Sequence, residues 1–294
     1  GSLATAGGLG ILIPPSITMV VYAVAADASI IRIFLAGFLP GFLLMGIFSL
    51  YIGIWAVRNS DKMPPVEPAM SFRKKMYASR RLIPVSLLIA FITWVLIAGI
   101  ATATECAAYG VLGSLVIAWW SKMLTWENFW AGLMSSTRVS CMIMFILAGA
   151  KYLSLTMAFT GIPIALAEWV ASLNLSPYML ITVLSIVYIL LGTALDGISM
   201  IVLTAAVVLP MIQKAGFDLI WFGIFIVLMV EIAEITPPVG FNLFVLQNMT
   251  GKDSNTIARA SIPFFICLVV CIIMLTVFPE IVTWLPDVVM GKDK

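Results

Sequence analysis

Two Pro-Pro pairs interrupt apolar runs that would otherwise form continuous membrane helices. Pro14 and Pro15 stand in GLGILIPPSITMVVYA, and Pro237 and Pro238 stand in EIAEITPPVGFNLFVLQ. Proline removes a backbone donor and clashes with the carbonyl four residues back, so each pair predicts a broken helix with unpaired carbonyl oxygens. In a bilayer such oxygens are tolerated only where protein buries them or where they line a polar cavity. Broken helices at matching places in two halves point to the binding site of a transporter.

The two pairs also indicate an internal repeat. They lie 223 residues apart, and at the same offset Pro40 matches Pro263 and Phe42 matches Phe265. Other identities at this offset are few. An inverted repeat is therefore a hypothesis that rests mainly on the prolines.

The composition places the chain in a membrane. Of its 294 residues, 62% are hydrophobic and 10% are charged, whereas an ordinary soluble domain has about 25% charged residues. Charge-free stretches such as 33–57, 82–104 and 260–279 reach the roughly 20 residues that a helix needs to cross a bilayer. The sequence predicts an all-α, polytopic membrane protein.

Several function classes are disfavoured by residues that are missing. The chain has no histidine, which removes Ser-His-Asp and Cys-His catalysis and histidine metal sites. The four cysteines lack CxxC spacing and fit buried apolar positions. A Gly-rich phosphate loop is also lacking. We expect no enzyme activity, no organic cofactor and no nucleic-acid partner.

One polar segment, 58–81, orients the chain. It contains seven Lys and Arg residues, and the positive-inside rule places it in the cytoplasm. The spans then alternate, with 139–158 following an amphipathic stretch on the inner surface and with the C-terminus outside. This topology puts 11 basic residues inside and 5 outside. The two broken helices then run in opposite directions, as an inverted repeat requires.

The predicted organisation has three parts. Residues 1–57 form the end of the first repeat, 58–81 form a cytoplasmic basic linker, and 82–294 form the second repeat. The chain begins almost at the first break, so we expect most of the first repeat to be missing. The second repeat is expected to contain a broken helix at about 219–249.

A helical hairpin is predicted at about 177–213. Two short apolar limbs, 177–195 and 197–213, join at Asp196 and Gly197. Limbs of about 17 residues are often re-entrant, which would put Asp196 inside the membrane at a functional position. In the alternative, two ordinary spans meet at a surface turn and Asp196 is only an N-cap. The spacing alone does not separate the two interpretations.

The breaks and the hairpin tip supply candidate ligands for a hard cation such as Na⁺. Backbone carbonyl oxygens freed by the prolines suit such an ion, although plain proline kinks packed among helices are an alternative. The candidate ion-binding residues are Gly10, Ile13 and Pro15 at the first break, Asp196, Gly197 and Ser199 at the hairpin tip, and Ala233, Thr236 and Pro238 at the second break. Candidate substrate contacts are Ser16, Ser199, Gly240 and Asn242.

Some charged residues near the apolar segments have open roles. Glu231 and Glu234 lie three residues apart before the second break. They could carry protons, pair with a neighbouring subunit or lie near the outer surface. Glu105 is expected to be an acid at a helix N-terminus. Arg138 is expected to anchor its helix at the membrane interface.

Four segments, in this order, resemble the large membrane subunit of the tripartite ATP-independent periplasmic (TRAP) transporters. They are GGLGILIPPSI at 7–17, GIATATECAAYG at 99–110, GTALDGISMIVL at 192–203 and ITPPVGFNLFV at 235–245. The resemblance implies Na⁺-coupled uptake of a small organic acid across the bacterial inner membrane. It implies two partners, a periplasmic substrate-binding protein and a small membrane subunit, and an elevator-type fold with mobile hairpins.

Carried over to this sequence, the resemblance implies two Na⁺ sites. One would use Gly10, Ile13 and Pro15 with the tip of a first hairpin, which is expected just before residue 1. The other would join the hairpin tip at Asp196 to the second break. Two alternatives remain open, namely a proton-coupled organic-anion transporter and a membrane scaffold subunit that does not transport.

Overall fold

The computed structural model describes residues 2–62, 71, 76–77, 79–80, 82–173, 175–237, 240–251 and 253–291. The elements found in these residues are helices, and no strand occurs among them. This confirms the all-α prediction. Contacts divide the chain into one unit of residues 1–51 and 143–294 and a second unit of residues 52–142. Most of the basic segment 58–81 lies outside the described residues, so its predicted role and the repeat boundaries stay predictions.

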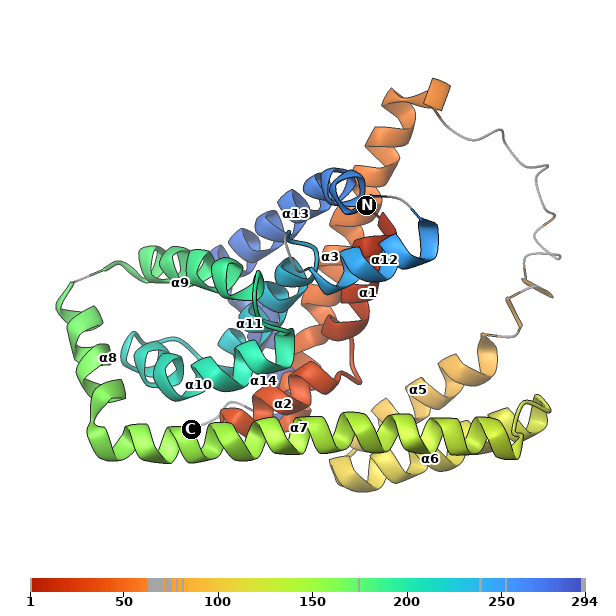
Figure 1. Cartoon of the computed structure of the whole chain (residues 1–294), viewed down its shortest axis with the longest axis horizontal. Coiled ribbons are helices and arrows are strands. Elements are labelled where there is room, and N and C mark those ends of the chain that lie inside the picture. Colours follow the sequence, from red (N-terminus) through yellow and green to blue (C-terminus); the bar gives the residue numbers. More distant parts are fainter. Residues whose placement is uncertain are drawn as a thin grey trace. The chain divides into compact units, whose positions relative to one another are not determined.

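The first unit contains both broken helices (Figure 1). Its elements are α1 (Ser2–Leu12), α2 (Ile17–Ala25), most of α3 (Ile30–Arg58), the second half of α7 (Trp126–Thr160), α8 (Ile162–Ser172), α9 (Pro177–Gly192), α10 (Gly197–Lys214), α11 (Leu219–Glu234), α12 (Phe241–Thr250), α13 (Ser254–Val277) and α14 (Glu280–Met290). Pro40 and Pro263, which match at the repeat offset, both lie inside long helices, α3 and α13. The order of broken helix followed by long helix therefore occurs twice.

Helix α11 forms the centre of the first unit. Residues 220–233 are all buried, and α1, α2, α9, α10, α12, α13 and α14 contact the helix. Such burial follows from a sequence that is apolar on every side. Trp221 and Phe225 stack at 5.7 Å between ring centroids, and the Trp221 indole donates a 2.9 Å hydrogen bond to the Leu275 carbonyl oxygen on α13. The second break thus begins at the end of the most enclosed helix.

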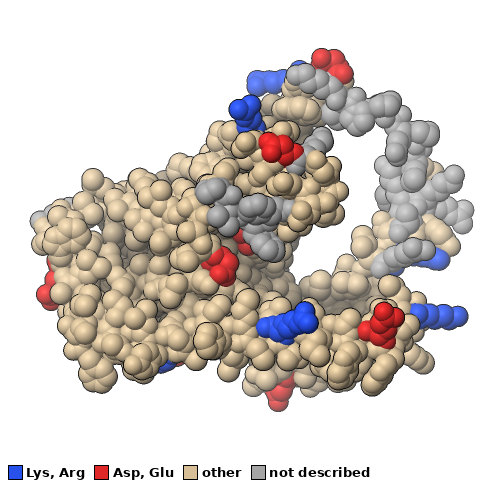
Figure 2. All heavy atoms as spheres, viewed as in Figure 1, with Lys and Arg blue, Asp and Glu red and all other residues tan. Residues whose placement is uncertain are grey.

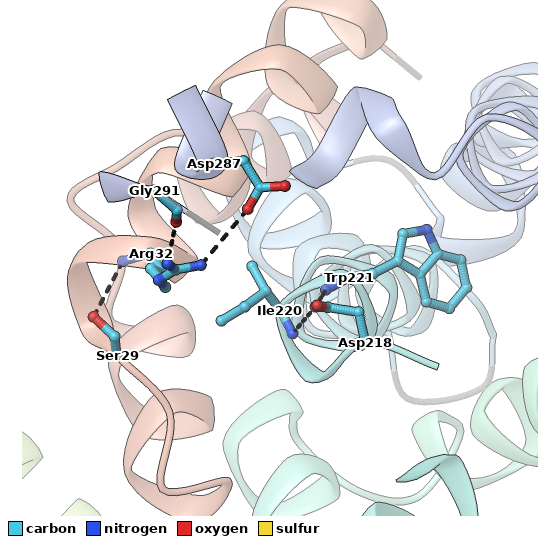
Figure 3. Close-up of polar contacts among 7 residues, drawn as sticks. All are labelled: Ser29, Arg32, Asp218, Ile220, Trp221, Asp287 and Gly291. Carbon is cyan, nitrogen blue, oxygen red and sulfur yellow. Dashed lines mark hydrogen bonds and ion pairs between the residues drawn. The ribbon is translucent and has the colours of Figure 1, made fainter. Parts of the chain in front are cut away.

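Polar contacts attach the start of α3 and the start of α11 to their surroundings (Figure 3). The Arg32 guanidinium reaches the Asp287 carboxylate at 3.7 Å and donates to the Gly291 carbonyl oxygen, which joins α3 to the end of α14. Asp218 caps α11 by accepting hydrogen bonds from the backbone of Ile220 and Trp221. The Arg32 contacts thus join two helices, whereas the Asp218 bonds stabilise the first turn of α11 itself.

The second unit contains α5 (Ile83–Ile97), α6 (Ala103–Trp120) and the first half of α7, after the short 3₁₀ turn η1 (Ser60–Lys62). Helices α5 and α6 pack closely because glycines face branched side chains. A Cβ on Gly113 would lie 2.3 Å from a Leu88 methyl carbon. Glu105 forms a capping box with Thr102 at the start of α6, as expected of an acid at a helix N-terminus.

Helix α7 differs from the prediction. The sequence suggested an amphipathic surface stretch followed by a separate span at 139–158, whereas the structure has one continuous helix, Trp126–Thr160. No proline occurs between its ends, so nothing stops helix propagation. Its side chains are mostly exposed although they are mostly apolar.

The surface and the helix lengths agree with a multi-pass membrane protein. Among the described residues, four helices are long and apolar enough to cross a bilayer, or five if the bent pair α1–α2 counts as one span. Figure 2 shows few Lys, Arg, Asp and Glu side chains among the other residues of the visible face. Exposed apolar side chains on this scale need lipid or protein to cover them.

Candidate functional site

The first predicted break is confirmed. Helix α1 ends at Leu12, α2 begins at Ile17, and the two helices are bent by 49°. The Pro-Pro pair falls inside the interruption, where the missing N–H groups would otherwise continue the helix. The Ser16 hydroxyl accepts a 3.4 Å hydrogen bond from the Met19 backbone and caps α2. Ser16, a predicted substrate contact, is thus a buried cap residue.

Glycines of α3 let the first break pack closely. A Cβ on Gly37 would lie 2.5 Å from the Leu12 carbonyl oxygen, and one on Gly41 would lie 2.7 Å from the Ile13 side chain. Of the three ion-site candidates here, Ile13 is half-buried, whereas Gly10 and Pro15 are exposed. Among the described residues, no atom outside the local helix lies within 4 Å of the position that a Cβ on Gly10 would take.

The second predicted break is also confirmed. Helix α11 ends at Glu234 and α12 begins at Phe241. The Thr236 backbone donates to the Ala233 carbonyl oxygen at 3.1 Å, and the Gly240 backbone donates to the Thr236 carbonyl oxygen at 3.1 Å. The prolines had predicted unpaired oxygens, but these two carbonyl oxygens are paired, and only a second lone pair on each is left for an ion. A Cβ on Gly240 would lie 2.8 Å from the Glu234 carbonyl oxygen, so only glycine fits beside it. Pro238 lies outside the described residues.

The hairpin of α9 and α10 brings its tip to the last turn of α11 (Figure 1). A Cβ on Gly192 would lie 2.2 Å from the Ala233 Cβ, and a Cβ on Gly197 would lie 2.2 Å from a Val230 methyl carbon. The Tyr188 hydroxyl and the Thr204 hydroxyl form a 2.9 Å hydrogen bond that joins the two limbs. Two of the predicted ion-site segments, the hairpin tip and the end of α11, are therefore neighbours.

Asp196 is an N-cap in the structure. Its carboxylate accepts a 3.1 Å hydrogen bond from the Ser199 backbone at the start of α10, and the side chain is exposed. This geometry agrees with the N-cap interpretation, and the contacts of the tip with α11 agree with the re-entrant one. Only Oδ2 of Asp196 accepts the cap hydrogen bond, so Oδ1 can contact an ion.

The two acids of α11 differ in exposure. Glu231 is fully buried, and Glu234 is half-buried with its carboxylate accepting a 2.9 Å hydrogen bond from the Asn242 side-chain amide. This hydrogen bond spans the second break. Asn242, a predicted substrate contact, thus directs its N–H toward an acid. Glu231 packs against Gly8 of α1, because a Cβ on Gly8 would lie 2.3 Å from the Glu231 carboxyl group. The sequence contains a signal for this contact, since the two positions are 223 residues apart, like the two Pro-Pro pairs.

The basic candidates are not part of these breaks. Arg138 is exposed in the second unit. Lys151 is exposed on α7 and borders a cavity of 590 Å³ that is lined by residues of α2, α7 and α10. The ion-site candidates therefore contain no basic side chain in the described residues, and they are suited to a cation rather than to an anion.

A membrane protein whose helices break at two matching points, with a hairpin tip against one break, has the architecture of secondary transporters. The comparisons with known proteins agree. Residues 1–281 match the family model described as "Tripartite ATP-independent periplasmic transporter, DctM component". The chain belongs to this family of transporter permeases, which are not enzymes.

Named relatives extend over nearly the whole chain. It is 35% identical over 288 residues to the C4-dicarboxylate TRAP transporter large permease protein DctM of Pseudomonas aeruginosa, covering 98% of this chain and 67% of that protein. It is 32% identical to the protein of the same name from Rhodobacter capsulatus, covering 98% of this chain and 68% of that protein. It is 29% identical to the ectoine/5-hydroxyectoine TRAP transporter large permease protein UehC of Ruegeria pomeroyi, covering 99% of this chain and 67% of that protein.

Proposed function

We propose that this chain is part of a Na⁺-coupled permease that imports a small carboxylate. The observation that carries the proposal is the contact of the hairpin tip with the last turn of α11, directly before the second break. There a cap carboxylate, a helix N-terminus and carbonyl oxygens of an interrupted helix lie in one region. Oxygen ligands and one acid suit Na⁺, and the N–H groups of α10 suit an anionic substrate.

The proposed second Na⁺ site uses the predicted residues of both segments. Asp196, Gly197 and Ser199 would contribute from the hairpin tip, and Ala233, Thr236 and Pro238 from the break. Ion binding would hold the tip against α11 and offset the charge of the carboxylate substrate. Gly10, Ile13 and Pro15 would belong to a first site that needs ligands from a further segment.

The names of the relatives support the proposed substrate class. Two of the relatives are named for C4-dicarboxylates and one for ectoine and 5-hydroxyectoine. We propose a C4-dicarboxylate as the substrate to test first. Delivery by a periplasmic binding protein, a small membrane subunit, the bacterial inner membrane, the cytoplasmic position of 58–81 and an elevator movement are parts of the same proposal.

Uptake in proteoliposomes tests it. The permease that contains this sequence would be reconstituted with its binding protein and small subunit, and labelled C4-dicarboxylate would be supplied under an inward Na⁺ gradient. We expect uptake that stops when K⁺ replaces Na⁺ at the same membrane potential. Uptake driven equally well by a pH gradient without Na⁺ would instead favour the proton-coupled alternative. Absence of uptake under every gradient would favour the scaffold alternative.

A further inference from the structure

Glu231 is a buried acid that nothing in the proposed mechanism uses. Its side chain has no exposed surface, and neither carboxylate oxygen has a hydrogen-bond partner among the described residues. Arg32 pairs with Asp287 and Lys214 pairs with Glu168, and neither of these ion pairs includes Glu231. Buried polar groups almost always have partners, so a fully buried carboxyl group without one is a candidate ligand for a positive ion.

The carboxyl group of Glu231 lies against helix α1. A Cβ on Gly8 would lie 2.3 Å from Cδ and from Oε1 of Glu231, so the absence of a side chain at Gly8 provides the space that the acid occupies. The neighbouring Gly7 faces the Asn242 side chain, whose oxygen would lie 3.9 Å from a Cβ placed there. Two consecutive glycines of α1 therefore border both the acid of α11 and the amide of α12.

Other groups around this junction add negative charge or none. Glu234 interacts electrostatically with Glu231 and binds the Asn242 amide at 2.9 Å, which orients the amide. The thiol of Cys271 on α13 also interacts electrostatically with Glu231. No Lys, Arg, Asp or Glu occurs in α1 or α12. The junction thus gathers two carboxyl groups and an amide oxygen, with no basic side chain in the described residues.

The repeat offset explains why this site would exist once. Gly8 and Glu231 are 223 residues apart, the same offset as the two Pro-Pro pairs, and they contact each other. Equivalent residues of two repeats meet only at the axis that relates the repeats. Here a small residue, Gly8, faces a large one, Glu231, so a single acid is accommodated.

We propose that Glu231, Glu234 and Asn242 form a cation site at the junction of α1, α11 and α12, and that its ligand is Na⁺. Carboxylate and amide oxygens are the donors that hard cations prefer, and the thiol is too soft to contribute. The site shares the second break with the proposed hairpin site, but the carboxyl group of Glu231 lies on another side of α11. Residues 230 and 233 face the hairpin, whereas 231 faces α1, because positions one or two residues apart point to different sides of a helix.

The test counts bound ions on the purified permease in detergent. Binding of ²²Na⁺ at saturation is measured for the wild type and for Glu231→Gln, which keeps the shape of the side chain and removes its charge. We expect one Na⁺ fewer per permease in the variant. Glu105→Gln serves as the matched control, because Glu105 is an exposed cap residue outside this unit.

The outcomes separate this site from the proposed function. An unchanged ²²Na⁺ count in Glu231→Gln, with the variant eluting as a single folded species, would overturn the proposal. This is the result expected if Glu231 carries a proton instead of contacting Na⁺. Asp196→Ala tests the hairpin site in the same assay. If Asp196→Ala leaves the count unchanged and uptake needs no Na⁺, the proposed coupling fails, whereas a loss in Glu231→Gln would still support the new site.

Discussion

Gly192 offers the sharpest test of the hairpin contact, because no side chain fits at this position. In Gly192→Ala the new Cβ would lie 2.2 Å from the Cβ of Ala233 and 3.1 Å from its Cα. These atoms are attached to the backbone of the most buried helix, so they cannot rotate away. The hairpin would have to withdraw from α11. The substitution thus separates the tip from the second break without altering a proposed ligand.

The expected size follows from the cost of overpacking. Inserting a methyl group into a well-packed contact costs about 1–3 kcal/mol. If Na⁺ binds only while the tip rests on α11, this cost falls on the ion-bound state. A penalty of that size corresponds to a change of about 5- to 150-fold in an equilibrium constant. We therefore expect the Na⁺ concentration that gives half-maximal uptake to rise by about that factor.

The assay is labelled-dicarboxylate uptake in proteoliposomes over a range of Na⁺ concentrations, with choline keeping the ionic strength constant. Gly46→Ala is the control, since Gly46 lies in helix α3 and has nothing within 4 Å of its Cβ position. Ala233→Gly added to Gly192→Ala should recover part of the affinity, because it removes the nearest atom. An equal Na⁺ requirement for Gly192→Ala and Gly46→Ala would refute the reasoning.

Three further predictions concern the break, the tip and the limbs of the hairpin. Replacing Pro237 and Pro238 by Ala should let the helix continue and abolish Na⁺-driven uptake, whereas retained uptake would mean that the prolines only kink the helix. Asp196→Asn keeps a good N-cap and should preserve thermal stability while it weakens Na⁺-dependent uptake. Wild-type uptake by this variant would mean that Asp196 only caps α10. Tyr188→Phe removes the 2.9 Å bond to Thr204 and should lower stability by about 0.5–1.5 kcal/mol, seen as a lower thermal midpoint with little change in uptake, and an unchanged midpoint would contradict this.

Local features were predictable from the sequence because their causes are local. The two breaks fall at the Pro-Pro pairs because proline acts on its own turn of helix. The hairpin limbs begin at the expected residues because Ser176 and Asp196 cap the helices that follow them. Helix α7 was less predictable, since amphipathic character does not show where a helix without breakers ends.

The surroundings of the acids could not be predicted in the same way. A spacing of three residues puts Glu231 and Glu234 on one side of a helix, but it does not show what that side faces. Burial of Glu231 depends on Gly8, which is 223 positions earlier in the chain. Likewise, the role of Gly192 depends on Ala233 of another helix.

The amino-acid sequence alone determined that this chain is a helical membrane protein with two interrupted helices and a transporter resemblance, since hydropathy and proline act along the chain itself. The tertiary structure decided which segments meet. It put the tip of the hairpin against the end of α11, and the Glu231 carboxyl group against Gly8 of α1. Contacts between distant segments depend on how whole helix surfaces fit together, and side-chain volume at each crossing becomes known only when both partners are in place.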